Sequence, residues 1–273
     1  RQRQMCIRDR KCCLWKRFVI VNKRRRLIVE ENKKILVIIP AYNEESNILK
    51  TYNSIIDYNN KKGTKYDVIV INDGSTDSTR EICVKNNIPM IALVHNLGIG
   101  GAVQTGYKYA YDNGYDIALQ YDGDGQHDVS HIEKIILPII LDEADLVIGS
   151  RFIDDTSSEF KSSLARRLGI SLLSKEIRLL TGKKIYDVTS GFRAANIEII
   201  SDFAQSYPFD FPEPITNMEL LKKQYRLKEV AVSMNEREGG VSSIRAWKTV
   251  YFMVNVMSVS YTHLRAHETK ANL

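Results

Sequence analysis

Residues 121–127, with the sequence YDGDGQH, carry the strongest chemical signal in the chain. An apolar run ends at Tyr121, and Asp122 and Asp124 then alternate with glycines. Alternate side chains on extended backbone share a side, so Asp122, Asp124 and Gln126 can converge. Two close carboxylates repel unless a cation neutralises them, and oxygen ligands of this kind suit Mg²⁺ or Mn²⁺ that bridges to substrate phosphates. The pattern predicts a metal site, with an Asp/Gly turn between strand and helix as the alternative.

Two further polar segments follow apolar runs. Asp73 lies just past a run of Val and Ile, where a carboxylate can accept hydrogen bonds from a base or ribose, and Asp77 is placed to cap the next helix. Gly98 and Gly100 open a later helical pattern, and glycines there allow a phosphate to approach the helix N-terminus closely. A dinucleotide-binding fingerprint is excluded because Val103 stands where its third glycine belongs.

Short apolar runs rich in β-branched residues alternate with longer segments of helical period. Strands are predicted at residues 35–39, 67–71, 90–94, 117–121 and 146–148. Helices are predicted at residues 44–58, 77–86, 101–113 and 131–141. The later part is predicted as a helix at 160–180, a loop at 181–192, a helix at 213–223 and a strand at 228–234. This alternation predicts one α/β domain with a mostly parallel central sheet and helices on both faces. The polar segments follow strand ends, where such sheets bind ligands.

The two ends of the chain share an unusual relationship at the level of codons. Residues 5–9 (MCIRD) can be encoded by DNA whose reverse complement encodes residues 259–263 (VSYTH). We interpret both ends as translated copies of an inverted-repeat adapter. Residues 1–28 are therefore expected to be an adapter and untranslated-region artefact or a basic arm, and residues 259–273 a second artefact. The folded domain is expected at residues 29–258.

Charge and cysteine content narrow the classes of function. Residues 1–32 contain 11 Lys and Arg against 3 Asp and Glu, so the rest of the chain has a net charge of −2 where the whole has +6. The basic character therefore gives no sign of a nucleic-acid partner. Cys83 is expected to be a small core residue, and one thiol in the domain fits a reducing cytoplasm. No run of about 18 apolar residues predicts a membrane span, and peripheral association with the inner face of the plasma membrane stays open.

Together these segments resemble glycosyltransferase family 2, the inverting enzymes of the GT-A fold. The resemblance covers about residues 33–244 and is strongest for the polyprenyl-phosphate sugar synthases. Its motifs are PAYNEE at 40–45, NDGS at 72–75, DGDGQH at 122–127, GSR at 149–151 and SGFR at 190–193. Their order and spacing imply a single GT-A domain over residues 29–258.

The resemblance also implies roles for individual residues. The nucleotide-sugar pocket is expected to contain Pro40, Tyr42, Glu44, Asp73 and Asp122, together with Gly98 at the helix start. The metal, Mg²⁺ or Mn²⁺, is expected on Asp122, Asp124 and Gln126. An acceptor phosphate is expected at Arg151, Arg166 and Arg167. Asp124 and Arg193 are expected to take part in catalysis.

The identity of the acceptor is left open by residues 207–214 (YPFDFPEP), which depart from the phosphate-acceptor branch. This segment is more similar to bacterial enzymes of surface-polysaccharide synthesis. A hydroxyl acceptor needs a general base, for which Asp187 and Glu213 are candidates. A phosphate acceptor needs none, because its second pKa lies near 6. The loop at 237–240 resembles a flexible family segment near the acceptor site.

The expected function is inverting sugar transfer from a UDP- or GDP-sugar to a polyprenyl phosphate or a cell-surface glycan. A sugar nucleotidyltransferase is one alternative, but the chain shows no glycine- and lysine-rich N-terminal loop suited to a triphosphate. A catalytically inactive scaffold that binds sugar nucleotides is another. Such a scaffold has no evident need for the set Asp122, Asp124 and Gln126.

Overall fold

The computed structural model describes residues 33–153, 164–210 and 212–233. The elements described here belong to one unit that begins at Lys34. The expectations for residues 1–28, 237–240 and 259–273 concern parts of the chain outside the described residues. The proposed domain boundaries therefore stay predictions.

In the described part of this unit, a seven-stranded sheet forms the centre. Its strands are β1 (Ile35–Ala41), β2 (Tyr66–Asn72), β3 (Met90–Ala92), β4 (Ile117–Gln120), β5 (Leu146–Ser150), β6 (Arg193–Asn196) and β7 (Leu227–Ala231). Their order is β3-β2-β1-β4-β6-β5-β7. All neighbours are parallel except that β6 runs antiparallel to both β4 and β5. The predicted mostly parallel sheet is confirmed.

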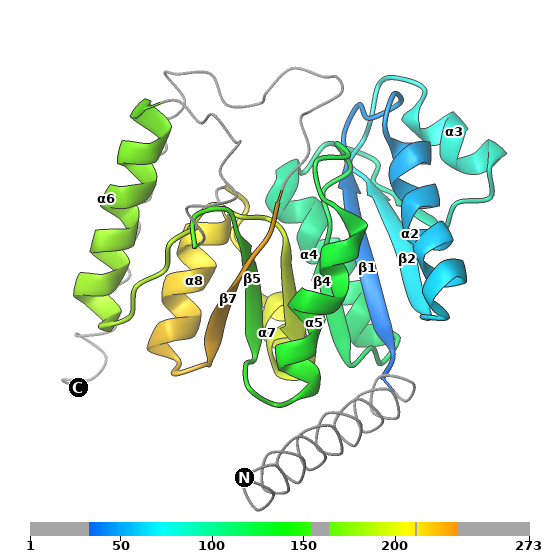
Figure 1. The fold of residues 1–273 in the computed structure, drawn as a ribbon. Helices are drawn as coiled ribbons and strands as arrows, with labels where there is room; N and C mark the ends of the chain where they lie inside the picture. Colours follow the sequence, from blue (N-terminus) through cyan, green and yellow to red (C-terminus); the bar gives the residue numbers. More distant parts are fainter. Residues whose placement is uncertain (1–32, 154–163, 211, 234–273) are drawn as a thin grey trace, which may run out of the picture. The chain divides into compact units, whose positions relative to one another are not determined.

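Helices cover both faces of this sheet (Figure 1). They are α2 (Ile48–Lys62), α3 (Thr79–Lys85), α4 (Gly98–Asp112), α5 (Ile132–Ile140), α6 (Leu164–Thr181), α7 (Ile197–Gln205) and α8 (Pro212–Lys222), with a short 3-10 turn η1 (Val129–His131). One core packs α4, α6, α7 and α8 on the sheet face that carries Leu36 and Ile38. The other packs α2, α3 and α5 on the face that carries Val37 and Ile39. Because alternate residues of a strand point to opposite faces, a continuous apolar run such as β1 serves both cores. Cys83 is fully buried in the second core, as expected.

Among the described residues of the second half, the sequence-based prediction missed the elements β6 and α7. β6 and α7 occupy residues between the predicted loop at 181–192 and the predicted helix at 213–223. β6 has only four residues, RAAN, and two alanines between an arginine and an asparagine give no clear apolar period. It is a strand because β4 and β5 flank it and pair with its backbone.

Asp145 joins the ends of three neighbouring strands. It lies one residue before β5 and accepts hydrogen bonds from the backbone N–H of Arg226 (2.7 Å), just before β7, and from Arg226 Nη2 (2.7 Å). Asn196 at the end of β6 donates to it from Nδ2 (3.2 Å). The hydrogen bonds from Arg226 hold the pKa of Asp145 below its usual range, against the effect of burial.

We expect Asp145→Asn to lower the free energy of unfolding near neutral pH. A carboxyl with a depressed folded-state pKa adds stability above its unfolded pKa of ~3.9, and this stability is lost as the pH falls through the folded value. The difference from wild type, measured by urea unfolding over a pH series, should therefore shrink below about pH 4. Asp142→Asn is the matched control, because Asp142 pairs with the same arginine but its side chain is 87% exposed. An equal effect of both variants would contradict this account.

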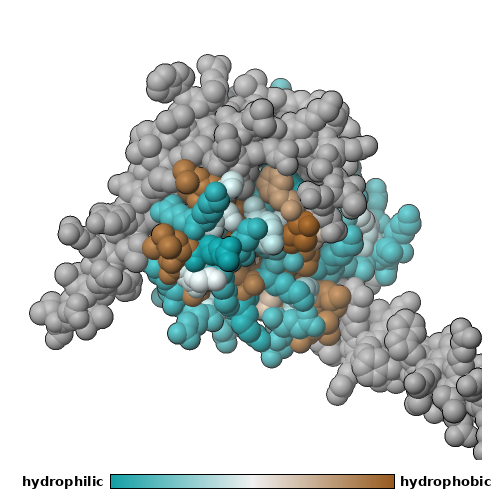
Figure 2. Space-filling model, turned by 60° about the vertical axis from the view of Figure 1, so that its left-hand side comes forward, coloured by the Kyte–Doolittle hydropathy of each residue, from teal (hydrophilic) through white to brown (hydrophobic). Residues whose placement is uncertain are grey.

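One face of the described residues is mixed in polarity (Figure 2). On the face shown in Figure 2, apolar side chains form separate patches among hydrophilic ones. Within the described ranges, no helix is both long and apolar enough to cross a bilayer.

Candidate active site

The loops that follow β1 and β2 are tied together at the carboxyl edge of the sheet. Asn43 Oδ1 accepts a hydrogen bond from the Thr76 N–H (2.8 Å), and the Glu44 N–H donates to Thr79 Oγ1 (2.9 Å). Of the predicted nucleoside residues, Tyr42 and Glu44 lie in the first of these loops, and Pro40 lies in the strand that precedes it. Pro40 is buried at the end of β1, whereas Tyr42 is 48% exposed and accessible to a ligand.

Asp73 connects this edge to the start of α4. Its Oδ1 atom accepts a hydrogen bond from the Leu97 N–H (2.7 Å), and the Gly98 N–H also interacts with it. Burial raises the pKa of Asp73, and these two backbone hydrogen bonds act in the opposite direction. Gly98 adopts φ +76°, a left-handed conformation that glycine adopts at little cost. The structure therefore brings the predicted residues Asp73 and Gly98 together, with Asp73 capping the helix.

Asp122 follows β4 and has both a fixed orientation and an accessible side chain. Its Oδ2 atom lies 3.0 Å from His127 Nε2, and the Asp122 side chain is 37% exposed. The His127 ring is buried and stacks on the Phe192 ring, with 4.4 Å between centroids. Burial favours the neutral acid. The electrostatic interaction with His127 and the hydrogen bonds from His127 and Gln120 outweigh this effect of burial. Together with nearby Arg151, they hold the pKa of Asp122 below its usual range.

Gly191 leaves room for this carboxylate. A Cβ atom at Gly191 would lie 2.8 Å from Gln120 Nε2 and 3.1 Å from Asp122 Oδ1. Such distances are shorter than ordinary contacts, so with a side chain at this position the Gln120 amide would have to move and the Asp122 carboxylate would have to shift slightly. The glycine of the SGFR segment thus allows two separate motifs to meet.

The predicted metal ligands lie in one short turn after β4. The Gln126 N–H donates to Asp124 Oδ1 (3.1 Å), and Asp122, Asp124 and Gln126 are all partly exposed. Among the described residues, no three His, Cys, Asp or Glu side chains are grouped closely enough to hold a metal alone. This donor set fits a hard cation such as Mg²⁺ that takes its other ligands from substrate phosphates and water.

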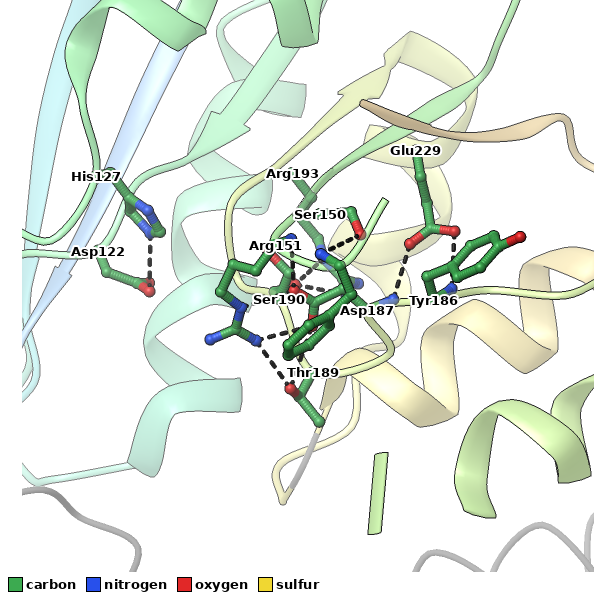
Figure 3. Close-up of polar contacts among 11 residues, drawn as sticks. Asp122, His127, Ser150, Arg151, Tyr186, Asp187, Thr189, Ser190, Arg193 and Glu229 are labelled. Carbon is green, nitrogen blue, oxygen red and sulfur yellow. Dashed lines mark hydrogen bonds and ion pairs between the residues drawn. The ribbon is translucent and has the colours of Figure 1, made fainter. Parts of the chain in front are cut away.

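Arg151 and Asp187 form an ion pair with several hydrogen bonds near this edge. Arg151 Nε donates to Asp187 Oδ2 (2.7 Å), and Arg151 Nη2 donates to Asp187 Oδ1 (2.8 Å). The Arg151 N–H also reaches Oδ2 (3.1 Å), and Nη2 donates to Thr189 Oγ1 (3.1 Å). The Arg151 side chain is 8% exposed and that of Asp187 is fully buried. Figure 3 shows this pair between Asp122 with His127 on one side and Glu229 on the other.

Arg193 and Glu213 lie within electrostatic range of each other. Arg193 is fully buried and donates to the Ser190 carbonyl (Nη2, 3.0 Å) and to Thr216 Oγ1 (Nη1, 2.9 Å). Glu213, in the first turn of α8, is half-buried, and burial raises its pKa while the charge of Arg193 acts against that rise. Asp122 lies within electrostatic range of Glu213, and Gln120 interacts with both carboxylates.

Arg166 and Arg167 both fall on α6. Their side chains are outside the described part of the structure, so their predicted contact with an acceptor phosphate stays a prediction.

Two residues of the site were not found from the sequence. Gln120 is buried at the end of β4 between Asp122 and Glu213, and a glutamine inside an apolar strand was the available signal, because a buried amide needs a partner. Glu229 on β7 accepts hydrogen bonds from the Asp187 and Tyr186 N–H groups, each at 2.8 Å. It lies 42 residues after Asp187, and nothing in the sequence indicates that contact.

Comparison with known proteins decides the family. A family model described as glycosyl transferase family 2 matches residues 36–203, which is more than half of the chain. The chain belongs to glycosyltransferase family 2. As a family 2 member it is a glycosyltransferase, which confirms the resemblance inferred from its motifs.

Named relatives belong to the polyprenyl-phosphate branch of family 2. The UDP-N-acetylglucosamine–dolichyl-phosphate N-acetylglucosaminyltransferase of Methanococcus voltae is 40% identical over 179 residues, covering 59% of this chain and 68% of the relative. The undecaprenyl-phosphate mannosyltransferase of Micrococcus luteus is 27% identical over 231 residues, covering 81% and 92%.

A solved structure of similar fold is the glucosyl-3-phosphoglycerate synthase of Mycobacterium tuberculosis in complex with Mn²⁺, UDP and phosphoglyceric acid. It superimposes with a TM-score of 0.58 at 19% identity, covering 78% of this family 2 chain and 74% of the other. The likeness confirms the predicted GT-A fold.

Proposed function

We propose that this glycosyltransferase transfers a sugar from a nucleotide-diphosphate donor to a polyprenyl phosphate. One observation carries the proposal: Arg151, fixed by Asp187, lies within electrostatic range of Asp122 and Glu213. A cation held in place by an ion pair therefore lies within electrostatic range of the carboxylate that follows β4. Such a pair can serve two anionic groups at one edge of the sheet, because Asp122 can bind the donor diphosphate through a divalent ion and Arg151 can bind the acceptor phosphate directly. The names of the M. voltae and M. luteus relatives support this acceptor class.

On the donor side, the nucleoside is expected against Pro40, Tyr42 and Glu44, with Asp73 and Gly98 at the start of α4. Asp122, Asp124 and Gln126 would hold Mg²⁺ or Mn²⁺, and that ion would offset the negative charge that develops on the departing diphosphate. The ionised state of Asp122 fits this role, because its pKa is held below its usual range. The structure of the M. tuberculosis protein contains Mn²⁺ and UDP, which supports a divalent ion here.

On the acceptor side, the phosphate oxygen is the nucleophile and needs no general base near neutral pH. Attack on the sugar face opposite the diphosphate would invert the anomeric centre. Asp187 is fully buried and both its oxygens bind Arg151. We therefore assign Asp187 to the orientation of Arg151 in place of the general-base role suggested by the sequence. A lipid acceptor places this reaction at a membrane surface.

Glu213 favours a second candidate function, transfer to a glycan hydroxyl. Its carboxylate lies in the first turn of α8, within electrostatic range of Asp122, on a segment bounded by Pro212 and Pro214. A base at this position can take the proton of an attacking hydroxyl. Glu213→Gln separates the two functions, because a hydroxyl acceptor would lose roughly 10²–10⁴-fold in rate and a phosphate acceptor far less.

Thermal unfolding of the full chain with UDP or GDP, each with and without Mn²⁺, tests the donor class. A nucleotide at about 100 times its Kd should stabilise the protein by ~2.7 kcal/mol, and the stabilisation should require the ion. A transfer assay with the matching nucleotide sugar and a polyprenyl phosphate then tests the acceptor. A folded protein that binds no nucleotide, or that transfers only to glycan hydroxyls, would contradict the proposal.

A further inference from the structure

Two carboxylates are connected to the Arg151 guanidinium one after the other. Asp187 binds the guanidinium directly, and Glu229 binds the backbone of Asp187. Glu229 Oε1 accepts a hydrogen bond from the Asp187 N–H (2.8 Å), and its Oε2 accepts one from the Tyr186 N–H (2.8 Å). Asp187 in turn binds Arg151 through both of its carboxylate oxygens. Figure 3 shows the three side chains in this order, with Glu229 on the side of Arg151 away from Asp122.

Glu229 also contacts the strand that carries Arg151. In the parallel pairing of β5 with β7, Glu229 lies opposite Ile148, and the Ser150 side chain forms a hydrogen bond with the Glu229 carboxylate. One carboxylate thus holds the backbone of Asp187 and the residue immediately before Arg151. The Glu229 carboxylate thus positions both Arg151 and Asp187, which fixes the orientation of these two side chains relative to each other.

This arrangement buries the negative charge of Glu229 close to that of Asp187, which costs free energy. Burial raises the pKa of Glu229, and the hydrogen bonds from Tyr186, Asp187 and Ser150 act against that rise. Glu229 and Asp187 repel each other, and a buried charge costs free energy unless it is fully hydrogen-bonded. A carboxylate with two oxygens can accept from both backbone N–H groups at once, whereas a neutral amide has only one acceptor oxygen. The geometry therefore requires this residue type.

We propose that Glu229 is a positioning residue of the acceptor site, which sets the orientation of the Arg151 guanidinium through Asp187. The inference rests on the proposed function, in which Arg151 binds the acceptor phosphate. Residues that orient a directly bonded group in this way typically change activity by roughly 10–100-fold when replaced, as the outer partners of metal ligands do.

A double-substitution cycle tests this inference in the full chain. Glu229→Gln keeps the side-chain shape but turns an N–H donor toward one of the two backbone N–H groups. It should raise the KM for polyprenyl phosphate by about tenfold or more and leave the KM for the nucleotide sugar unchanged. In an Arg151→Lys background, the same change should have little further effect, because an ammonium has no planar fork to be oriented. Glu143→Gln is the matched control, since this carboxylate forms an exposed pair with Lys228.

A crystal structure of Glu229→Gln provides a second measurement that does not depend on the acceptor. The bidentate contact between Arg151 and Asp187 should be lost or rotated. An unchanged contact, equal effects on both KM values, or an undiminished effect in the Arg151→Lys background would overturn the inference. A wild-type protein that transfers no sugar to polyprenyl phosphate would instead overturn the proposed function, and the crystal structure would still decide whether Glu229 positions Arg151.

Discussion

Asp122→Asn is expected to lower the rate of sugar transfer by roughly 10²–10³-fold while leaving the fold intact. Asparagine keeps the size of the side chain and an oxygen that can contact His127, but it removes the charge beside the predicted metal and donor diphosphate. The 37% exposure of this side chain means that little packing is lost. Asp124→Asn should act in the same direction, and the Mn²⁺-dependent stabilisation by nucleotide should weaken in both variants. Initial rates and thermal unfolding measure the two effects separately.

Asp128→Asn serves as the matched control for these two variants. Asp128 lies in the same polar segment, but its Oδ1 atom accepts the Ser130 N–H and caps the short turn η1. The Asp128→Asn variant should therefore retain most of the transfer activity. Full activity in Asp122→Asn, or unfolding caused by that change, would remove this residue from the active site.

Arg151→Ala is expected to lower the free energy of unfolding by about 3–5 kcal/mol in addition to abolishing acceptor binding. The substitution leaves the fully buried Asp187 carboxylate without its guanidinium, and an uncompensated buried charge is strongly destabilising. Urea unfolding gives the change in stability. The double variant Arg151→Ala/Asp187→Ala should recover part of the lost stability but none of the activity, because no isolated charge remains in the core.

An exposed ion pair provides a comparison for the loss of unfolding free energy expected in Arg151→Ala. Lys223 Nζ lies 2.8 Å from Asp202 Oδ2, and the two side chains are 57% and 29% exposed. Lys223→Ala should cost at most about 1 kcal/mol, since water screens exposed pairs. Similar losses in Lys223→Ala and Arg151→Ala would show that burial of the Arg151 pair has no special effect.

Much of the first half of the molecule could be predicted from the sequence. The runs that became β1, β2 and β4 are apolar on both faces, and each is followed by a polar segment at the same sheet edge. Local periodicity and turn chemistry suffice for such elements, because burial on both faces leaves a continuous apolar signature. The same information located Asp73 and Asp122 at strand ends before their neighbours were known.

The second half shows where local signals are insufficient. β6 and α7 were missed, and the antiparallel insertion of β6 between β4 and β5 places Arg193 beside Gln120. The sequence indicated Asp187 as a candidate base, but its environment is set by Arg151, 36 residues earlier, and by Glu229, 42 residues later. The distance between such residues along the chain carries no information about their contact in space.

The sequence by itself determined the α/β class, the order of the motifs and the residue types able to bind a metal and a diphosphate. Only the tertiary structure decided which carboxylate is accessible and which is held by a cation. Asp122 and Asp187 are the same residue type, yet one is 37% exposed and the other is fully buried against Arg151. The physical reason is that residue type fixes the chemistry a side chain can perform. Burial, pairing and charge, which come from distant segments, decide the state in which that side chain is held.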